Sequence, residues 1–118
     1  MIACHLRYVV NAAKLREFEL YSRVWITLVN RFGGRHLGYL MPSEGASNIA
    51  LATFTFASLA AYEDYRRKAA ADPECQAAVR YADATGCIVS FERTFLRPVT
   101  EGLAPDALAP DALAKELS

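Results

Sequence analysis

The stretch IALATFTFASLAAYEDYRRKAAADPEC, residues 49–75, carries the clearest structural signals of the chain. Its first part, residues 49–56, is a run of β-branched and aromatic residues that is typical of a strand. Ser58 can cap a following helix, because its hydroxyl can accept a hydrogen bond from a free amide of the first turn. The sequence DPE at residues 72–74 restarts the helix with a cap, a proline suited to the first turn and a carboxylate near the positive helix end. A strand followed by two consecutive helical segments predicts half of a small α+β domain.

The remaining elements are marked by hydrophobic periodicity. Residues 2–10 alternate in polarity, which predicts a strand, and apolar residues at helical spacing then predict a helix that ends near Phe32. Residues 35–41 and 87–96 are predicted strands, and Gly38 in the first of them is typical of a bulge or a close approach by a backbone or ligand. The order βαββαβ predicts an α+β fold in which a four-stranded antiparallel sheet carries both helices on one face.

The other face of this sheet has no helix to cover it. The first strand places His5, Arg7 and Val9 there, a set too polar for an ordinary core and too apolar for open water. The last strand adds one of two alternating sets, either Ile88, Ser90 and Glu92 or Val89, Phe91 and Phe95. In both cases a monomer would expose apolar groups, so we expect a homodimer formed through this sheet face.

Composition excludes several classes of protein. The 118 residues are enough for one domain, and the 13 acidic and 13 basic side chains give no electrostatic reason to expect nucleic-acid or anionic-membrane binding. No segment is long and apolar enough to span a bilayer, and the N-terminal residues lack the pattern of a cleaved leader. Cys4, Cys75 and Cys87 form no CxxC pair, which favours reduced thiols in a cytoplasmic protein.

The composition changes after the last predicted strand. We assign residues 1–99 to the domain and residues 100–118 to an Ala/Leu/Pro-rich C-terminal tail, in which LAPDA occurs twice in tandem. Pro110 would break a helix that began at Pro105, so the composition favours a loose tail of short turns. The alternative is an arm that clasps the dimer partner through Leu103, Leu108 and Leu113.

Short pieces distributed over residues 1–99 share the pattern of one known family. They are His5-Leu6-Arg7, Gly33-Gly34, Gly38, Glu44-Gly45, Asn48, Ser58-Leu59-Ala60, Tyr62-Glu63, Tyr65-Arg66-Arg67, Ala71-Asp72-Pro73 and Leu96-Arg97-Pro98. In this order and spacing the chain resembles the NIPSNAP family. The chain departs from the family pattern at His5, where members often have an acidic residue, and at Ala12-Ala13, where Pro-Gly is common. The resemblance implies a ferredoxin-like unit that pairs sheet to sheet with a second copy as a dimeric α+β barrel.

Arg7 and Glu92 are the first candidates for chemistry. The first and last strands should be antiparallel neighbours, so the two side chains can face each other across the pair. In a functional interpretation, Arg7 holds a carboxylate or enolate of a small ligand while His5 or Glu92 moves a proton. In a structural interpretation, Arg7 and Glu92 are an ion pair buried at the dimer interface.

Aromatic residues form the second set of candidates. An aromatic pocket between sheet and helices can be lined by Tyr8, Tyr21, Trp25, Tyr39 and Phe54. Tyr39 is the strongest of them, because the neighbouring Gly38 leaves space beside it. The alternative is that these residues are ordinary core, as aromatic residues at helical and strand spacing usually are.

Metal and haem sites are weaker hypotheses. His5, His36 and Glu92 have the composition of a site with two histidines and one carboxylate, but the expected strand order separates them, so no metal site is predicted. A haem-binding barrel would use His5 or His36 as axial ligand. The basic run at residues 66–68 is interpreted as a solvated helix face, and the cysteines as inert core residues. The ligand-binding candidates are Arg7, Trp25, His36 and Tyr39.

Three functions remain open at this point. The leading hypothesis is a protein that binds a small organic molecule in the barrel lumen and, in its catalytic form, acts as a cofactor-independent monooxygenase or isomerase. This form rests on analogy with other barrels of this kind. The second hypothesis is a non-catalytic protein-interaction module, and the third is the haem-binding barrel. We expect no other cofactor.

Overall fold

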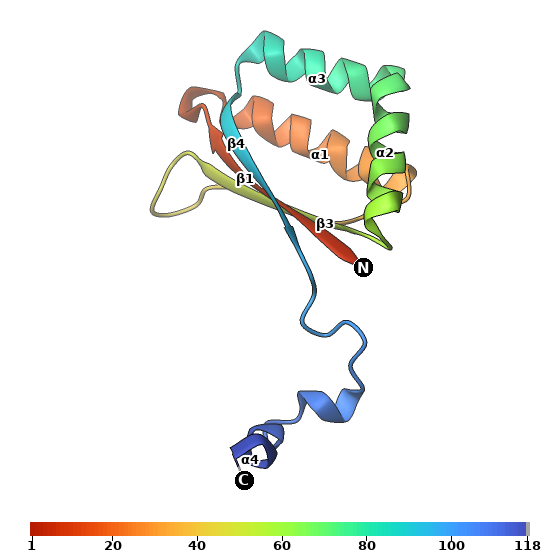
Figure 1. The fold of residues 1–118 in the computed structure, drawn as a ribbon. Coiled ribbons are helices and arrows are strands. Elements are labelled where there is room, and N and C mark those ends of the chain that lie inside the picture. The colour runs from red at the N-terminus through yellow and green to blue at the C-terminus, as the bar shows by residue number, and fades with distance from the viewer. Residues whose placement is uncertain (118) are drawn as a thin grey trace.

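The predicted element order is confirmed in the structure, a computed structural model that describes residues 1–117 (Figure 1). The main elements are β1 (Ile2–Val10), α1 (Leu15–Arg31), β2 (Arg35–Leu40), β3 (Ile49–Phe56), α2 (Leu59–Ala71), α3 (Pro73–Thr85) and β4 (Ile88–Leu96). A short 3-10 helix, η1 (Ala12–Lys14), precedes α1.

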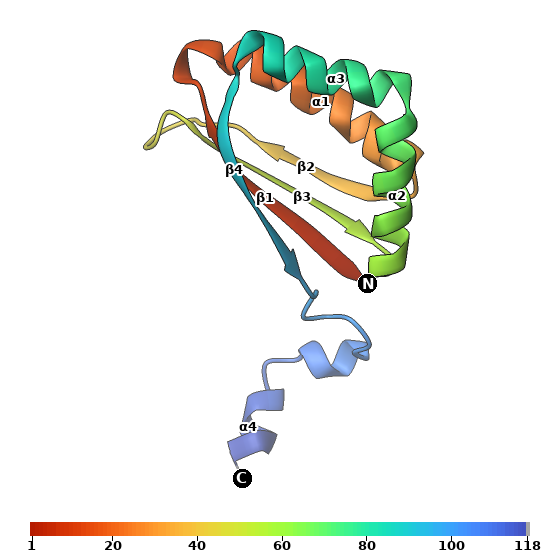
Figure 2. The same ribbon diagram turned by 45° about the horizontal axis from the view of Figure 1, so that its top comes forward.

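The four strands form one antiparallel sheet in the order β2-β3-β1-β4. Helices α1 and α3 run along one face of the sheet, and α2 stands at one end of it (Figure 2). The opposite face, which we call the open face, carries no helix within residues 1–117. This arrangement confirms the ferredoxin-like α+β fold.

The break between α2 and α3 forms as the sequence predicts. The hydroxyl of Ser58 accepts a hydrogen bond of 3.1 Å from the amide of Ala61 and so begins α2. The carboxylate of Asp72 accepts one of 2.9 Å from the amide of Cys75, and Pro73 occupies the first helical position of α3. The two caps define two separate helices, which leave the chain free to change direction between them (Figure 1).

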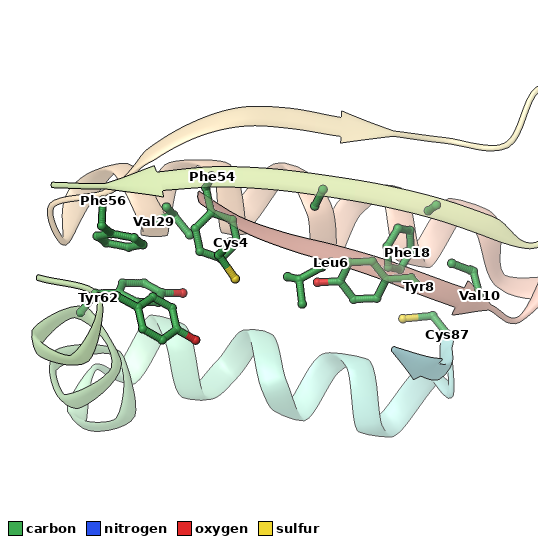
Figure 3. Close-up of a cluster of buried hydrophobic side chains, with 13 residues drawn as sticks. Cys4, Leu6, Tyr8, Val10, Phe18, Val29, Phe54, Phe56, Tyr62 and Cys87 are labelled. Carbon is green, nitrogen blue, oxygen red and sulfur yellow. The ribbon is translucent and has the colours of Figure 1, made fainter. Parts of the chain in front are cut away.

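The core lies between the sheet and the helices. Strands β1 and β3 direct alternate side chains towards the helices, and these include Cys4, Leu6, Tyr8, Val10, Ala50, Ala52, Phe54 and Phe56 (Figure 3). Helix α1 contributes Phe18, Leu28 and Val29, all almost completely buried. This core packs the sheet against α1. The cavity described below lies on the same, helix-facing side of β1.

Bulges shift the alternation of two strands. In β2 the pairing with β3 skips Leu37 and continues at Gly38, whose φ of 115° favours glycine. In β4 the pairing with β1 skips Val89. Of the two predicted alternation sets for the open face, the first is correct for Ser90 and Glu92 but wrong for Ile88, because it does not allow for the extra residue, and the second is wrong for Phe91 and Phe95. The open face receives Ser90 and Glu92, whereas the helix-facing side receives Ile88, Phe91 and Phe95.

Beyond β4 the chain leaves the sheet and forms two short helical turns (Figure 1). These are η2 (Pro105–Leu108) and α4 (Ala112–Leu117), and Pro110 lies between them. An ion pair joins the amino group of Met1 to Glu101 at the start of this segment. Leucines of the segment are exposed, namely Leu103, Leu108, Leu113 and Leu117. In the described part of the chain, every helix is too short or too polar to cross a bilayer.

Candidate functional site

A cavity of about 880 Å³ lies between the helix-facing side of the sheet and the three long helices. Its floor comes mainly from β1 and β4, and its walls come from α1, α2 and α3. Figure 3 shows Leu6 and Tyr8 pointing from β1 into the space on this side of the sheet. Phe91 of β4 lines the cavity and is 50% exposed, so the cavity opens to solvent along β4.

Aromatic side chains dominate the lining. They are Tyr8, Tyr21, Trp25, Tyr39, Phe54, Tyr62, Tyr65 and Phe91. The five residues that the sequence analysis grouped as a candidate aromatic pocket all belong to this set. Their rings contact one another, with centroids 6.0 Å apart for Tyr8 and Tyr39 and 6.2 Å apart for Tyr21 and Trp25. The same side chains therefore serve both as core and as cavity wall.

Gly38 does not create the space beside Tyr39. Gly38 is paired with Thr53 on the open face, whereas Tyr39 is paired with Ala52 on the helix-facing side. No atom lies within 4 Å of the position that a Cβ of Gly38 would take, but that empty space is on the far side of the sheet. Tyr39 lines the cavity because the bulge at Leu37 shifts the alternation of β2 and so directs Tyr39 towards the helices.

The phenols of the cavity are neutral hydrogen-bond donors near neutral pH. Burial raises the pKa of Tyr8 to about 12 and raises the pKa of Tyr39 well above its ordinary value. Burial also raises the pKa values of Tyr21 and Tyr65. The indole nitrogen of Trp25 is buried and has no hydrogen-bond partner among residues 1–117. The wall thus offers donors to a ligand, but these four tyrosines are not bases.

Three arginines and one aspartate supply the charge of the wall, namely Arg66, Arg80, Arg93 and Asp83. A guanidinium nitrogen of Arg66 donates a hydrogen bond of 3.1 Å to the hydroxyl of Tyr62. The guanidinium of Arg93 lies 5.5 Å from the centre of the Phe91 ring. The wall is therefore apolar and aromatic, with a surplus of positive charge.

The candidate catalytic residues lie on the other face of the sheet. Arg7 and Glu92 are direct partners across β1 and β4, as the strand order predicts, but among residues 1–117 no ion pair joins them. A ring nitrogen of His5 lies 2.9 Å from the hydroxyl of Thr53 on the neighbouring strand. The structure thus brings Arg7, Glu92 and His5 together on the open face and separates them from the cavity. Whether they act on a ligand stays a prediction.

His36 lies on the helix-facing side of β2 beside the cavity lining. Its ring stacks on Tyr39 at 4.9 Å, and its Nδ1 accepts a hydrogen bond of 2.9 Å from the amide of Gly38. Burial lowers the pKa of His36 to about 4, so the ring is neutral and carries its proton on Nε2. That nitrogen is buried without a partner in the described chain.

These positions do not fit a metal or haem site. His5 and His36 project from opposite faces of the sheet, and residues 1–117 contain no cluster of three side chains that could hold a metal ion. For haem, Nε2 of His36 would have to give up its proton while Nδ1 lost the bond from Gly38. The structure therefore gives no support to His36 as an axial ligand.

The wall includes residues that the sequence patterns do not single out as candidates, among them Tyr62, Tyr65, Arg66 and Arg93. Tyr62 and Tyr65 are three residues apart, a spacing that by itself predicts the apolar stripe of a helix, and Arg66 belongs to the basic run predicted to be a solvated face. Within that run, Arg67 and Lys68 both pair with Asp64, while Arg66 turns towards Tyr62. The signal that could have separated Arg66 from its neighbours is its position one helical turn after Tyr62.

The fold and the cavity define a ferredoxin-like α+β protein with an aromatic pocket between sheet and helices. The sequence profile named NIPSNAP matches residues 6–101, and the chain belongs to the NIPSNAP family. No curated protein matches the chain with statistical significance.

Solved structures with the same fold come from several bacteria. A NIPSNAP family protein from Agrobacterium tumefaciens is 24% identical with a TM-score of 0.72, over 88% of this chain and 96% of that chain. An uncharacterized NIPSNAP domain protein from Burkholderia xenovorans is 19% identical with a TM-score of 0.71, over 88% and 100%. A proposed antibiotic biosynthesis monooxygenase from Nitrosomonas europaea is 8% identical with a TM-score of 0.65, over 84% and 99%. At these identities the similarity shows the fold alone.

Proposed function

We propose that the protein binds a small organic molecule with aromatic character in the cavity between sheet and helices. The observation that carries this proposal is the cavity itself, about 880 Å³ in volume and lined by eight aromatic residues together with aliphatic side chains and a few polar groups. Ligand pockets in proteins usually measure about 300–1,000 Å³ and combine apolar walls with a small number of directed polar groups. The neutral hydroxyl of Tyr8 and the unpaired indole N–H of Trp25 are groups of this kind.

This proposal moves the ligand from the barrel lumen to the helix side of the sheet. The lumen of a dimeric barrel would be bounded by the open faces of two copies, where Arg7 and Glu92 lie. Among residues 1–117, the cavity of about 880 Å³ lies on the helix side of the sheet and is partly open to solvent. Of the ligand-binding candidates, Trp25 and Tyr39 line the cavity, His36 stacks behind Tyr39, and Arg7 is on the other face.

We propose that the open face forms a homodimer interface. Leu40, at 67% exposure, lies on it beside Leu51, and Leu96, at 50%, lies on it towards the other end of the sheet. Covering apolar groups of this extent is favourable, and a second copy offers the complementary arrangement of Arg7 and Glu92.

The three buried free thiols support the cytoplasmic location expected from the sequence.

Binding is better supported than catalysis. Within the described cavity lining there is no histidine, and Asp83 is the only carboxylate. A cofactor-independent monooxygenase or isomerase would need a base to form an enolate, and the phenols of Tyr8 and Tyr39 stay protonated near neutral pH. Catalysis in this cavity would therefore depend on Asp83 or on an acidic proton of the substrate itself.

The exposed leucines of residues 103–117 favour a second function, that of a protein-contact arm. Burial of such leucines against another protein surface is favourable. This function and ligand binding use different parts of the chain, so both can hold in one protein.

A cavity-filling variant tests the ligand site. Ala82 lines the cavity from α3, whereas Ala84 on the same helix is exposed and does not. Ala82→Phe should abolish the thermal stabilisation that a panel of small aromatic compounds gives to the wild type, while Ala84→Phe should leave it unchanged. The proposal fails if no compound in the panel stabilises the wild type, or if Ala82→Phe responds as the wild type does.

A further inference from the structure

We propose that Arg66 and Arg93 together recognise the carboxylate of an aromatic ligand at one end of the cavity. This inference rests on the proposed function and deepens it by naming the chemical class of the ligand. Arg66 projects from α2 and Arg93 from β4, so two elements far apart in the sequence supply positive charge to one wall.

The two guanidinium groups converge on one region of the sheet. Arg93 follows Phe91 and precedes Phe95 on the helix-facing side of β4, and Phe95 contacts the ring of Tyr62 at 5.0 Å. Tyr62 is in turn the hydrogen-bond partner of Arg66. Beneath them lies Cys4, 1% exposed. Burial raises the pKa of this thiol, and the charges of Arg93 and Arg66 act on it in the opposite direction.

Neither arginine has an acidic partner in the described structure. The ion pairs described within residues 1–117 use Glu19, Asp64, Glu74 and Glu101, and none of them includes Arg66 or Arg93. The adjacent Arg67 shows the contrast, because it pairs with Asp64 at 2.9 Å and points away from the cavity. Two uncompensated cations at the edge of an apolar cavity favour an anionic group there.

Both side chains are exposed, and each has a contact that favours one orientation before a ligand arrives. Arg66 donates a hydrogen bond of 3.1 Å to the hydroxyl of Tyr62, and the guanidinium of Arg93 lies 5.5 Å from the centre of the Phe91 ring. The rest of the lining combines aromatic and aliphatic side chains with a few polar groups, among them the neutral phenol of Tyr8. A flat aromatic body with one carboxylate matches this combination, since the rings enter the cavity and the charge stays near the arginines.

The intrinsic fluorescence of Trp25 provides a direct readout, because Trp25 is the one tryptophan of the sequence and lines the same cavity. We would titrate the protein with 3-phenylpropionate and with its neutral amide, 3-phenylpropionamide. Wild type should bind the carboxylate at least about tenfold more tightly than the amide. Added salt should weaken binding of the carboxylate and leave binding of the amide unchanged.

Single substitutions then assign the effect. Arg66→Gln and Arg93→Gln should each weaken carboxylate binding about tenfold and change amide binding less than about twofold. Arg67→Gln is the matched control and should bind both compounds as the wild type does. Arg66→Lys serves as a second variant that keeps the charge if Arg66→Gln does not fold.

The outcomes separate the two proposals. Equal binding of carboxylate and amide by the wild type would overturn the carboxylate site and leave the aromatic cavity as a ligand site. An equal loss in Arg67→Gln and Arg66→Gln would overturn it too, since a general charge effect would then explain the data. If neither compound changes the Trp25 signal or the melting temperature, the carboxylate site and the proposed function both fail.

Discussion

Trp25 shows at the scale of a single residue how an apolar helix position can belong to a cavity. It lies near the centre of the apolar arc of α1, which favours full burial, yet it is only partly buried and its indole nitrogen has no partner in the described chain. The wide spacing between α1 and β4 leaves room that no side chain fills. Periodicity identifies the face of a helix, but it carries no information about how closely the opposite wall approaches.

Comparison of two aromatic truncations tests this description of Trp25. Phe18→Ala removes a ring that is fully buried and should cost about 4 kcal/mol. Trp25→Ala should cost only about 2 kcal/mol although the ring is larger, because part of its surface already faces the cavity. Urea unfolding followed by circular dichroism measures both. An equal or greater loss for Trp25→Ala would show that Trp25 is an ordinary core residue.

His36 gives the protein a predicted pH dependence at the residue scale. Burial lowers its folded pKa to about 4 from an ordinary value of 6.5, so between these values the unfolded chain binds more protons than the folded one. Stability should therefore be complete above about pH 6.5 and decline as the pH falls towards 4. His36→Phe should flatten this part of the stability curve relative to wild type. Parallel curves for the two proteins would contradict the burial of a neutral imidazole.

At the scale of elements, the helix ends were predictable because their signals are local. Ser58 and Asp72 cap α2 and α3 as the sequence suggests, and the alternation of β1 correctly separates its two faces. The bulges at Leu37 and Val89 were not predictable, because pairing between strands decides where an extra residue is accommodated. Which residues line the cavity depends on how α2, α3 and β4 are placed relative to one another. Local sequence patterns do not contain this information, so they do not identify Arg66 and Arg93 as lining residues.

The cap of α2 can be tested on its own. Ser58→Ala removes the oxygen that accepts the amide of Ala61, and it should cost about 1 kcal/mol. Ser58→Asp should retain most of the stability, since its carboxylate can accept the same hydrogen bond. Chemical denaturation of the three proteins provides the measurement. Equal stability of wild type and Ser58→Ala would mean that tertiary packing alone fixes the start of α2.

At the scale of the whole molecule, the open face determines the expected assembly. Light scattering at micromolar concentration should give the mass of a dimer for the wild type. Val9→Asp places a carboxylate on the open face and should give a monomer, because an unpaired charge is costly to bury. Val24→Asp is the control and should remain dimeric, because Val24 is exposed at the groove between α1 and α3, away from the open face. A wild type that runs as a monomer would contradict the proposed barrel.

The central claim is that the cavity between sheet and helices holds a small organic molecule. Native mass spectrometry of the protein, after incubation with the small-molecule extract of cells, measures this most directly. If a ligand occupies the cavity, wild type and Ala84→Phe should each show an added mass that is lost on denaturation. Ala82→Phe should show no added mass. Unmodified protein mass for the wild type, or the same added mass on Ala82→Phe, would contradict the central claim.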